Sequence, residues 1–112
     1  MSLVLVSRAF TDGLQRLTIA ERQRTLSTVR TLHASPRHPS LHTHRVLSVT
    51  TRHPAWEAYI TGRSLRLIFD VSGEPPTLRL WFVGSHQILA TVRRCPFDAT
   101  RLHPVTLDEL GA

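Results

Sequence analysis

The stretch "LRLIFDVSGEPPTLRLWFVGSH", residues 65–86, decides the fold. Two strand-like runs flank the turn signal "SGEPP", a pattern that predicts an antiparallel hairpin. Because side chains alternate along a strand, each run is predicted to bury one apolar face: Leu65, Leu67, Phe69 and Val71 in the first, and Leu78, Leu80 and Phe82 in the second. The opposite face is predicted to be polar and aromatic, with Arg66, Ile68 and Asp70 beside Arg79, Trp81 and Val83.

Upstream of this hairpin, the chain predicts one strand and two helices. "SLVLVS" reads as a strand, and Phe10, Leu14 and Leu17 fall on one helical face, although Gly13 weakens that helix. Thr18 and Glu21 form a capping-box pattern, so the second helix is expected to begin at Ile19. This helix should end by Ser35, because the residue before a proline avoids helical geometry. Its apolar face is predicted to run through Ile19, Leu26, Val29 and Leu32 or His33.

The element order predicts a single α+β domain. Residues 36–44 read as a loop, and "RVLSVT" and "WEAYIT" read as strands before the hairpin. A strand, two helices and an antiparallel meander then occupy residues 1–93. Residues 94–112 are predicted to be a C-terminal tail, with a short helix at Thr106–Leu110.

The positive charge of the chain is concentrated in one segment. Of 112 residues 14 are arginine and none is lysine, and the net charge is +6. Six arginines, five histidines and no acid lie between Arg22 and Trp56, whereas arginines and acids balance elsewhere. This segment predicts a polyanionic partner, and nucleic acid is the natural one. A solvated helix face followed by a basic loop is the alternative.

Other sequence features limit the possible classes. A single cysteine, Cys95, excludes an internal disulfide and fits the cytoplasm, and neither a secretory signal nor a membrane-spanning run is expected. The chain has no nucleophile elbow, P-loop or dinucleotide fingerprint, so no cofactor is expected.

The hairpin resembles the signature strands of the RelE/ParE superfamily of bacterial toxins. In that family the first strand carries an arginine and the second ends in valine-glycine followed by a polar pair, as in "LRLIFDV" and "LRLWFVGSH". The loop "SPRHPSLHTHRV" followed by a tryptophan is also similar to the loop of that family. The resemblance implies a RelE-like α+β fold and the toxin of a type II toxin–antitoxin pair. Some relatives cut messenger RNA on the ribosome, and others inhibit DNA gyrase without cutting.

The resemblance implies two catalytic residues, His86 and Arg66. RNA cleavage without metal needs a base for the 2′-hydroxyl, a group that holds the phosphate charge and an acid for the leaving oxygen. Histidine suits proton transfer near neutral pH, and the arginine fork suits phosphate. Both residues are expected outside the apolar core, with the strand pairing bringing them close together. The alternatives are a surface histidine in a turn and an arginine paired across strands with Asp70 or Glu57.

The remaining cations and one aromatic are predicted to contact RNA. They are Arg37, His42, His44, Arg45, Arg79 and Trp81. His38, His42 and His44 could approach a zinc ligand set, but the loop has no cysteine and no acid, so no metal is expected. His44 could instead pack against the sheet.

The first functional prediction is a ribosome-dependent, metal-independent mRNA endonuclease that uses 2′-hydroxyl attack on the phosphate. Its partners would be a cognate antitoxin, mRNA, the ribosome and, through the antitoxin, operator DNA, with no membrane. The alternatives are a ParE-like gyrase inhibitor and a degenerate antitoxin-binding or operator-binding module. They are favoured because residues 90–92 lack the aromatic that some relatives carry after the histidine.

Overall fold

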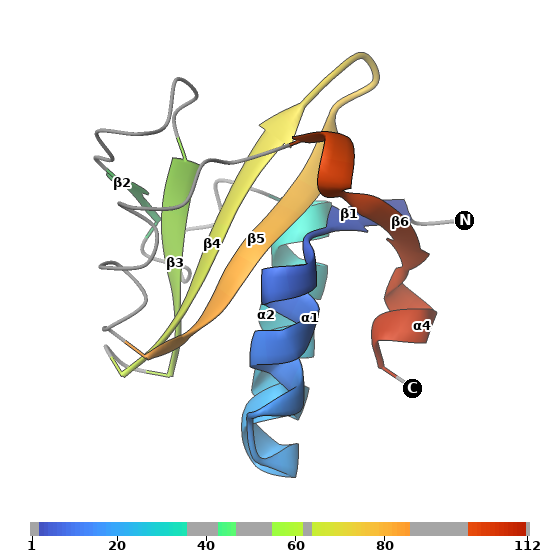
Figure 1. Cartoon of the computed structure of the whole chain (residues 1–112). Helices are drawn as coiled ribbons and strands as arrows, with labels where there is room; N and C mark the ends of the chain where they lie inside the picture. The colour runs from blue at the N-terminus through green and yellow to red at the C-terminus, as the bar shows by residue number, and fades with distance from the viewer. Residues whose placement is uncertain (1–2, 36–42, 47–54, 62–63, 86–98, 112) are drawn as a thin grey trace.

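The computed structural model describes residues 3–35, 43–46, 55–61, 64–85 and 99–111 (Figure 1). Its helices are α1 (Arg8–Gln15), α2 (Ile19–Ala34), a 3-10 helix (Ala99–Arg101) and α4 (Leu107–Leu110). Its strands are β1 (Leu3–Val6), β2 (His44–Val46), β3 (Ala55–Thr61), β4 (Leu65–Ser72), β5 (Thr77–Ser85) and β6 (His103–Thr106). No helix within these ranges is long and apolar enough to cross a membrane.

The strands form one sheet in the order β2-β3-β4-β5-β1-β6. Strand β1 runs parallel to β5, and all other neighbours are antiparallel. The predicted order of a strand, two helices and an antiparallel meander is confirmed. Strand β6, which the sequence did not predict, lies at the edge of the sheet beside β1 (Figure 1).

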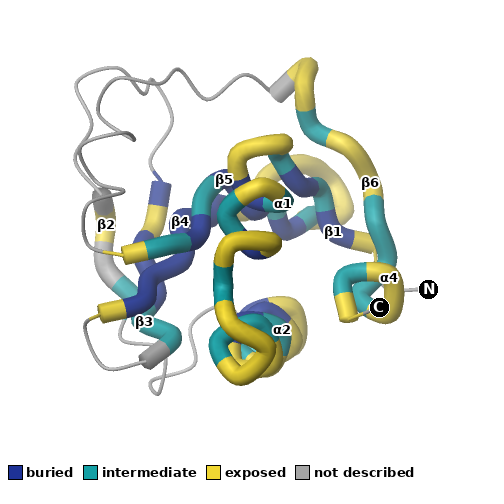
Figure 2. The backbone as a smooth tube through the Cα atoms, turned by 60° about the horizontal axis from the view of Figure 1, so that its bottom comes forward, coloured by how far each residue is buried: buried dark blue, intermediate teal, exposed yellow. Residues whose placement is uncertain are grey.

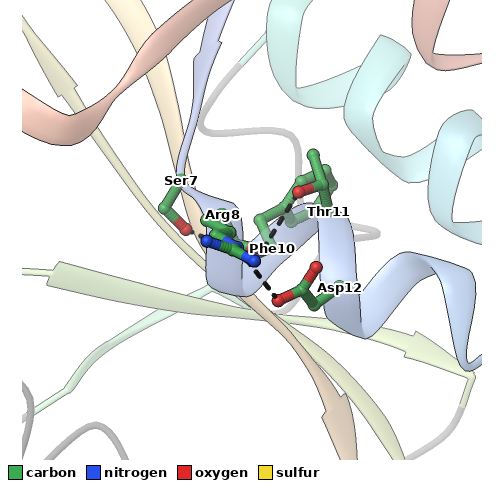
Figure 3. Close-up of polar contacts among 5 residues, drawn as sticks. All are labelled: Ser7, Arg8, Phe10, Thr11 and Asp12. Atoms are coloured by element: carbon green, nitrogen blue, oxygen red, sulfur yellow. Dashed lines mark hydrogen bonds and ion pairs between the residues drawn. The ribbon is translucent and has the colours of Figure 1, made fainter.

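Helix α1 begins at Arg8, and Ser7 before it serves as the N-cap. The Ser7 hydroxyl oxygen accepts a hydrogen bond from the Phe10 backbone N–H at 3.0 Å, and Arg8 forms an exposed ion pair with Asp12 one turn later (Figure 3). Phe10 and Leu14 are buried, as their spacing predicts. The cap satisfies an N–H that the first turn of a helix cannot bond internally.

Gly13 in α1 lies against β5. A Cβ atom at this position would be 2.5 Å from the carbonyl oxygen of Val83. No side chain fits there, so glycine allows the helix to approach the sheet closely. The helix propensity lost at Gly13 is therefore offset by this contact.

Helix α2 has the predicted boundaries. Thr18 and Glu21 form the complete capping box, and the helix ends at Ala34 with Ser35 as its C-cap. Val29 and Leu32 are buried together with Thr25, whose hydroxyl donates to the Glu21 carbonyl. The prediction for Ile19 is wrong: this first residue of the helix is 74% exposed.

The main core lies between the helices and one face of the sheet, here called the helix-side face. It joins residues from β1, both long helices and β3–β5: Val4, Val6, Phe10, Leu14, Val29, Leu32, Ala58, Leu65, Leu67, Phe69, Leu78, Leu80 and Val83. Figure 2 shows buried backbone running through β4 and β5, with exposed positions along the outer side of α2.

A β-bulge in β5 changes which residues face this core. Ile68 pairs with Phe82 and Phe69 with Leu80, so Trp81 has no opposite residue in β4. The extra residue reverses the alternation, which brings Val83 into the helix-side core and turns Phe82 to the other face. The predicted faces of Phe82 and Val83 are therefore wrong. Val71, also predicted to be buried, is 40% exposed.

The C-terminal segment joins the same sheet. Strand β6 pairs with β1, and the short helix predicted at Thr106–Leu110 is confirmed as α4, with Thr106 as its N-cap. The predicted domain boundary at residue 93 lies outside the described residues and stays a prediction.

Candidate functional site

The candidate site lies on the sheet face opposite the helices, here called the second face. Paired residues of neighbouring strands share a face, so the pairings Tyr59–Arg66–Gly84 and Asp70–Arg79 bring these residues to one side. By the same rule Glu57 lies beside Ile68 on this face. Strands β3, β4 and β5 together therefore position the predicted Arg66, Arg79 and Trp81.

The face that the sequence predicted to be polar and aromatic is buried at its centre. Glu57 is 0% exposed, Trp81 3% and Arg66 8%. A small apolar cluster of Ala55, Ile68 and Trp81 lies at its centre, with Phe82 and Leu102 packed against it. Arg66 was expected outside the apolar core; it belongs to neither apolar cluster, but its side chain is buried.

Arg66 forms a buried ion pair with Glu57. Its Nη1 donates to Glu57 Oε1 at 3.0 Å, and its guanidinium lies 5.0 Å from the centre of the Tyr59 ring. The cross-strand pairing that the sequence left open for Arg66 is thus present. From the sequence, Glu57 was expected only as a possible partner of Arg66, and the structure adds it to the site. The alternation of side chains in the predicted strand "WEAYIT" was the signal in the sequence that could have placed Glu57 on this face.

Arg79 forms a second, bidentate pair with Asp70. Its Nε and Nη2 donate to the two carboxylate oxygens at 2.6 Å and 2.7 Å, and its guanidinium lies 5.4 Å from the Trp81 ring. Arg66 and Asp70 are four residues apart in β4, which is about 13 Å at the rise of a strand. The second face therefore carries two arginine–carboxylate pairs with an apolar cluster between them.

His86 lies outside the described residues, but the strand pairing that leads to it is visible. Gly84 pairs with Arg66, and Ser85 pairs with Leu65. The end of β5 thus returns beside the beginning of β4, as predicted. His86 follows Ser85 directly in the chain.

The predicted RNA-contacting residues are only partly brought together. Arg79 and Trp81 join Arg66 on the second face. Arg45 is exposed and pairs with Trp56, which pairs with Phe69, so its register belongs to the helix-side face. Arg37 and His42 lie outside the described residues, and His44 is placed only as a residue of β2 opposite Glu57.

No group of three histidine, cysteine or carboxylate side chains gathers as metal ligands would in the ranges that the structure describes. Two of the three loop histidines, His38 and His42, lie outside those ranges. The expectation that these histidines bind no metal stays a prediction.

The arrangement combines charge with shielding from water. Each guanidinium contacts a carboxylate, so a phosphate that takes the place of this carboxylate must break the ion pair. In a site of low water content such exchange is expensive unless the face first becomes hydrated.

Comparison with known proteins supports the fold. No protein-family model and no curated protein sequence matches the chain. Among solved structures, the YoeB/ParE toxin from Agrobacterium tumefaciens superimposes with a TM-score of 0.62 at 19% identity, covering 77% of this chain and 99% of that one. The archaeal RelE–RelB complex from Pyrococcus horikoshii gives 0.57 at 17% identity, with coverages of 71% and 89%. The DinJ–YafQ complex of E. coli gives 0.57 at 17% identity, with coverages of 80% and 98%. The chain therefore has the RelE-like α+β fold that its hairpin motif predicted.

Proposed function

We propose that the chain is the toxin of a type II toxin–antitoxin pair and acts in the cytoplasm as a ribosome-dependent, metal-independent mRNA endonuclease. The observation that carries this proposal is the β4–β5 register. It brings Gly84 and Ser85 beside Leu65 and Arg66, so β5 ends next to the Arg66–Glu57 pair, and His86 is the next residue in the sequence.

In the proposed reaction the ribose 2′-oxygen attacks the adjacent phosphorus, and the bond to the 5′-oxygen breaks. His86 transfers a proton in this step, and Arg66 holds the charge on the phosphate. Glu57 orients the Arg66 guanidinium before RNA arrives. The products are a 2′,3′-cyclic phosphate and a 5′-hydroxyl, and no metal takes part.

The partners follow from the same proposal. Two of the similar structures are complexes, one named for RelE and RelB and the other for DinJ and YafQ. A cognate antitoxin is the corresponding partner of this chain, and operator DNA is reached through it. The phosphate contacts assigned to mRNA and the ribosome come from Arg37, His42, His44, Arg45, Arg79 and Trp81.

One observation favours a second candidate function. The Arg66 guanidinium is buried and paired with a carboxylate, an arrangement that also suits a purely structural role. If Arg66 has only this structural role, the chain would act without cutting RNA, as a gyrase inhibitor or as an antitoxin-binding or operator-binding module.

Induction of the protein without its antitoxin separates these candidates. The endonuclease should stop growth, with protein synthesis falling before DNA synthesis. If DNA synthesis fails first and gyrase-linked breaks appear, the chain is a gyrase inhibitor.

The catalytic assignment is tested on programmed ribosomes. His86→Ala should lower single-turnover cleavage by about 10²–10⁴-fold, the usual contribution of a positioned proton-transfer group. His33→Ala is the matched control, because His33 is exposed at the end of α2 and should leave the rate unchanged. Cleavage by folded His86→Ala at the wild-type rate would remove this residue from the mechanism.

A further inference from the structure

The burial of the second face requires a cover from outside its own strands. In a sheet with helices on one side, the other face is commonly solvated. Here Ile68 and Glu57 are fully buried on that face. Leu102, which comes just before β6, packs against the cluster of Ala55, Ile68 and Trp81.

Leu102 belongs to a segment that contacts both faces of the sheet. After Leu102, β6 pairs with β1 at four positions, from His103 opposite Val6 to Thr106 opposite Leu3. Val105, Leu107 and Leu110 then pack against the helix-side core. The segment Leu102–Leu110, here called the strap, therefore lies along the edge of β1 (Figures 1 and 2) and contacts the second face through its first residue.

The strap is held more weakly than the strands that it covers. None of its residues is fully buried, although Val4 and Val6 of the neighbouring β1 are. Pro104 has no backbone N–H to donate, and α4 has four residues, too few for a helix to be stable alone. Local opening is cheapest where apolar burial is smallest, so the strap should open before β4 and β5.

We propose that the strap is an autoinhibitory device that controls access to the second face. This inference rests on the proposed function, because it concerns the regulation of that same site. When the strap is closed, Leu102 shields the cluster beside which both arginines are paired with carboxylates. When it opens, water reaches these pairs and weakens them, so that RNA phosphates can exchange with Glu57 and Asp70. The ribosome-bound, active form is then the form with the strap displaced.

Hydrogen exchange at the Trp81 indole N–H measures the opening directly, whether or not the protein cleaves RNA. Leu102→Ala should speed this exchange by about tenfold, because a partly buried leucine no longer holds the strap closed. Leu17→Ala is the matched control: Leu17 is also half-buried but packs against the helix-side core. Equal exchange rates at Trp81 in the two variants would overturn the proposal.

A reversible cross-link that holds the strap closed tests the same device. Leu5 and Pro104 are directly opposite in the β1–β6 pair, at a separation suited to a disulfide. Leu5→Cys with Pro104→Cys, in a chain whose Cys95 is replaced by serine, should slow Trp81 exchange about tenfold when oxidised. Reduction should restore the rate. Unchanged exchange in the oxidised form would also reject the strap.

The two proposals fail in different ways. If the strap controls access, the oxidised double-cysteine protein loses ribosomal cleavage and regains it on reduction. If neither form cleaves RNA but exchange responds as expected, the endonuclease proposal fails and the strap stands as a conformational device. If the disulfide-bonded protein cleaves RNA as fast as the same protein with its disulfide reduced, the strap does not regulate the site.

Discussion

Replacing Arg66 should destabilise the whole domain. Arg66→Met keeps much of the aliphatic volume but removes the guanidinium that contacts Glu57. The Glu57 side chain is fully buried, so its carboxylate would stay in a medium of low polarity without this cation. A buried charge that loses its partner is far more costly than an exposed one.

The geometry of the Arg66–Glu57 pair gives the expected size of this loss in stability. Across 3.0 Å, with an effective dielectric constant of about 20, the Coulomb attraction is about 5 kcal/mol. Removing one partner of a buried pair typically costs about 3–5 kcal/mol. A domain of 112 residues is stable by about 6–17 kcal/mol. Arg66→Met should therefore lose between about a fifth and about four-fifths of the stability.

Urea unfolding of four proteins checks this reasoning: the wild type, Arg66→Met, Glu57→Gln and the double substitution. The double variant should be at least about 2 kcal/mol more stable than Arg66→Met, because it leaves no buried charge at this place. Arg45→Met is the control, since Arg45 is exposed and its loss should cost less than about 0.5 kcal/mol. A loss below about 1 kcal/mol for Arg66→Met would refute the reasoning.

This result decides how the role of Arg66 in cleavage is tested. A substitution that unfolds the domain stops cleavage for a trivial reason. Arg66→Lys keeps the positive charge beside Glu57 but lacks the planar fork that grips two phosphate oxygens. A folded Arg66→Lys protein with slow cleavage would therefore support the phosphate role.

Three further predictions concern helix packing, capping and metal. Gly13→Ala should destabilise the domain by about 1–3 kcal/mol, measured by thermal unfolding, because its Cβ would collide with the Val83 carbonyl; an unchanged midpoint would contradict this. Ser7→Ala should cost about 2–3 kcal/mol and Thr18→Ala about 1 kcal/mol, because both lose an N-cap but only Ser7 also donates to the Trp81 carbonyl; equal urea midpoints would argue against this difference. Purified protein should hold no stoichiometric zinc, and chelator should leave cleavage intact; elemental analysis that finds one metal per chain, lost on replacing His42 and His44 together, would reverse this prediction.

Local patterns in the sequence determined most of the fold. The capping box at Thr18 and Glu21 set the start of α2, and the proline at position 36 marked its end. Two β-rich runs around "SGEPP" predicted the β4–β5 hairpin and the return of Gly84 beside Arg66. These signals act between residues close in the chain, where spacing translates directly into geometry.

Only the tertiary structure decided which residues the second face buries. The bulge at Trp81 exchanges the faces of Phe82 and Val83, because one added residue reverses a period of two. The Ser7 hydroxyl donates a hydrogen bond to the carbonyl of Trp81, the bulged residue, although the two residues are 74 positions apart in the sequence. Leu102, from the C-terminal part of the chain, packs against the apolar cluster of the second face. Such contacts join distant segments, so alternation along one strand could not reveal that Arg66 is buried with Glu57.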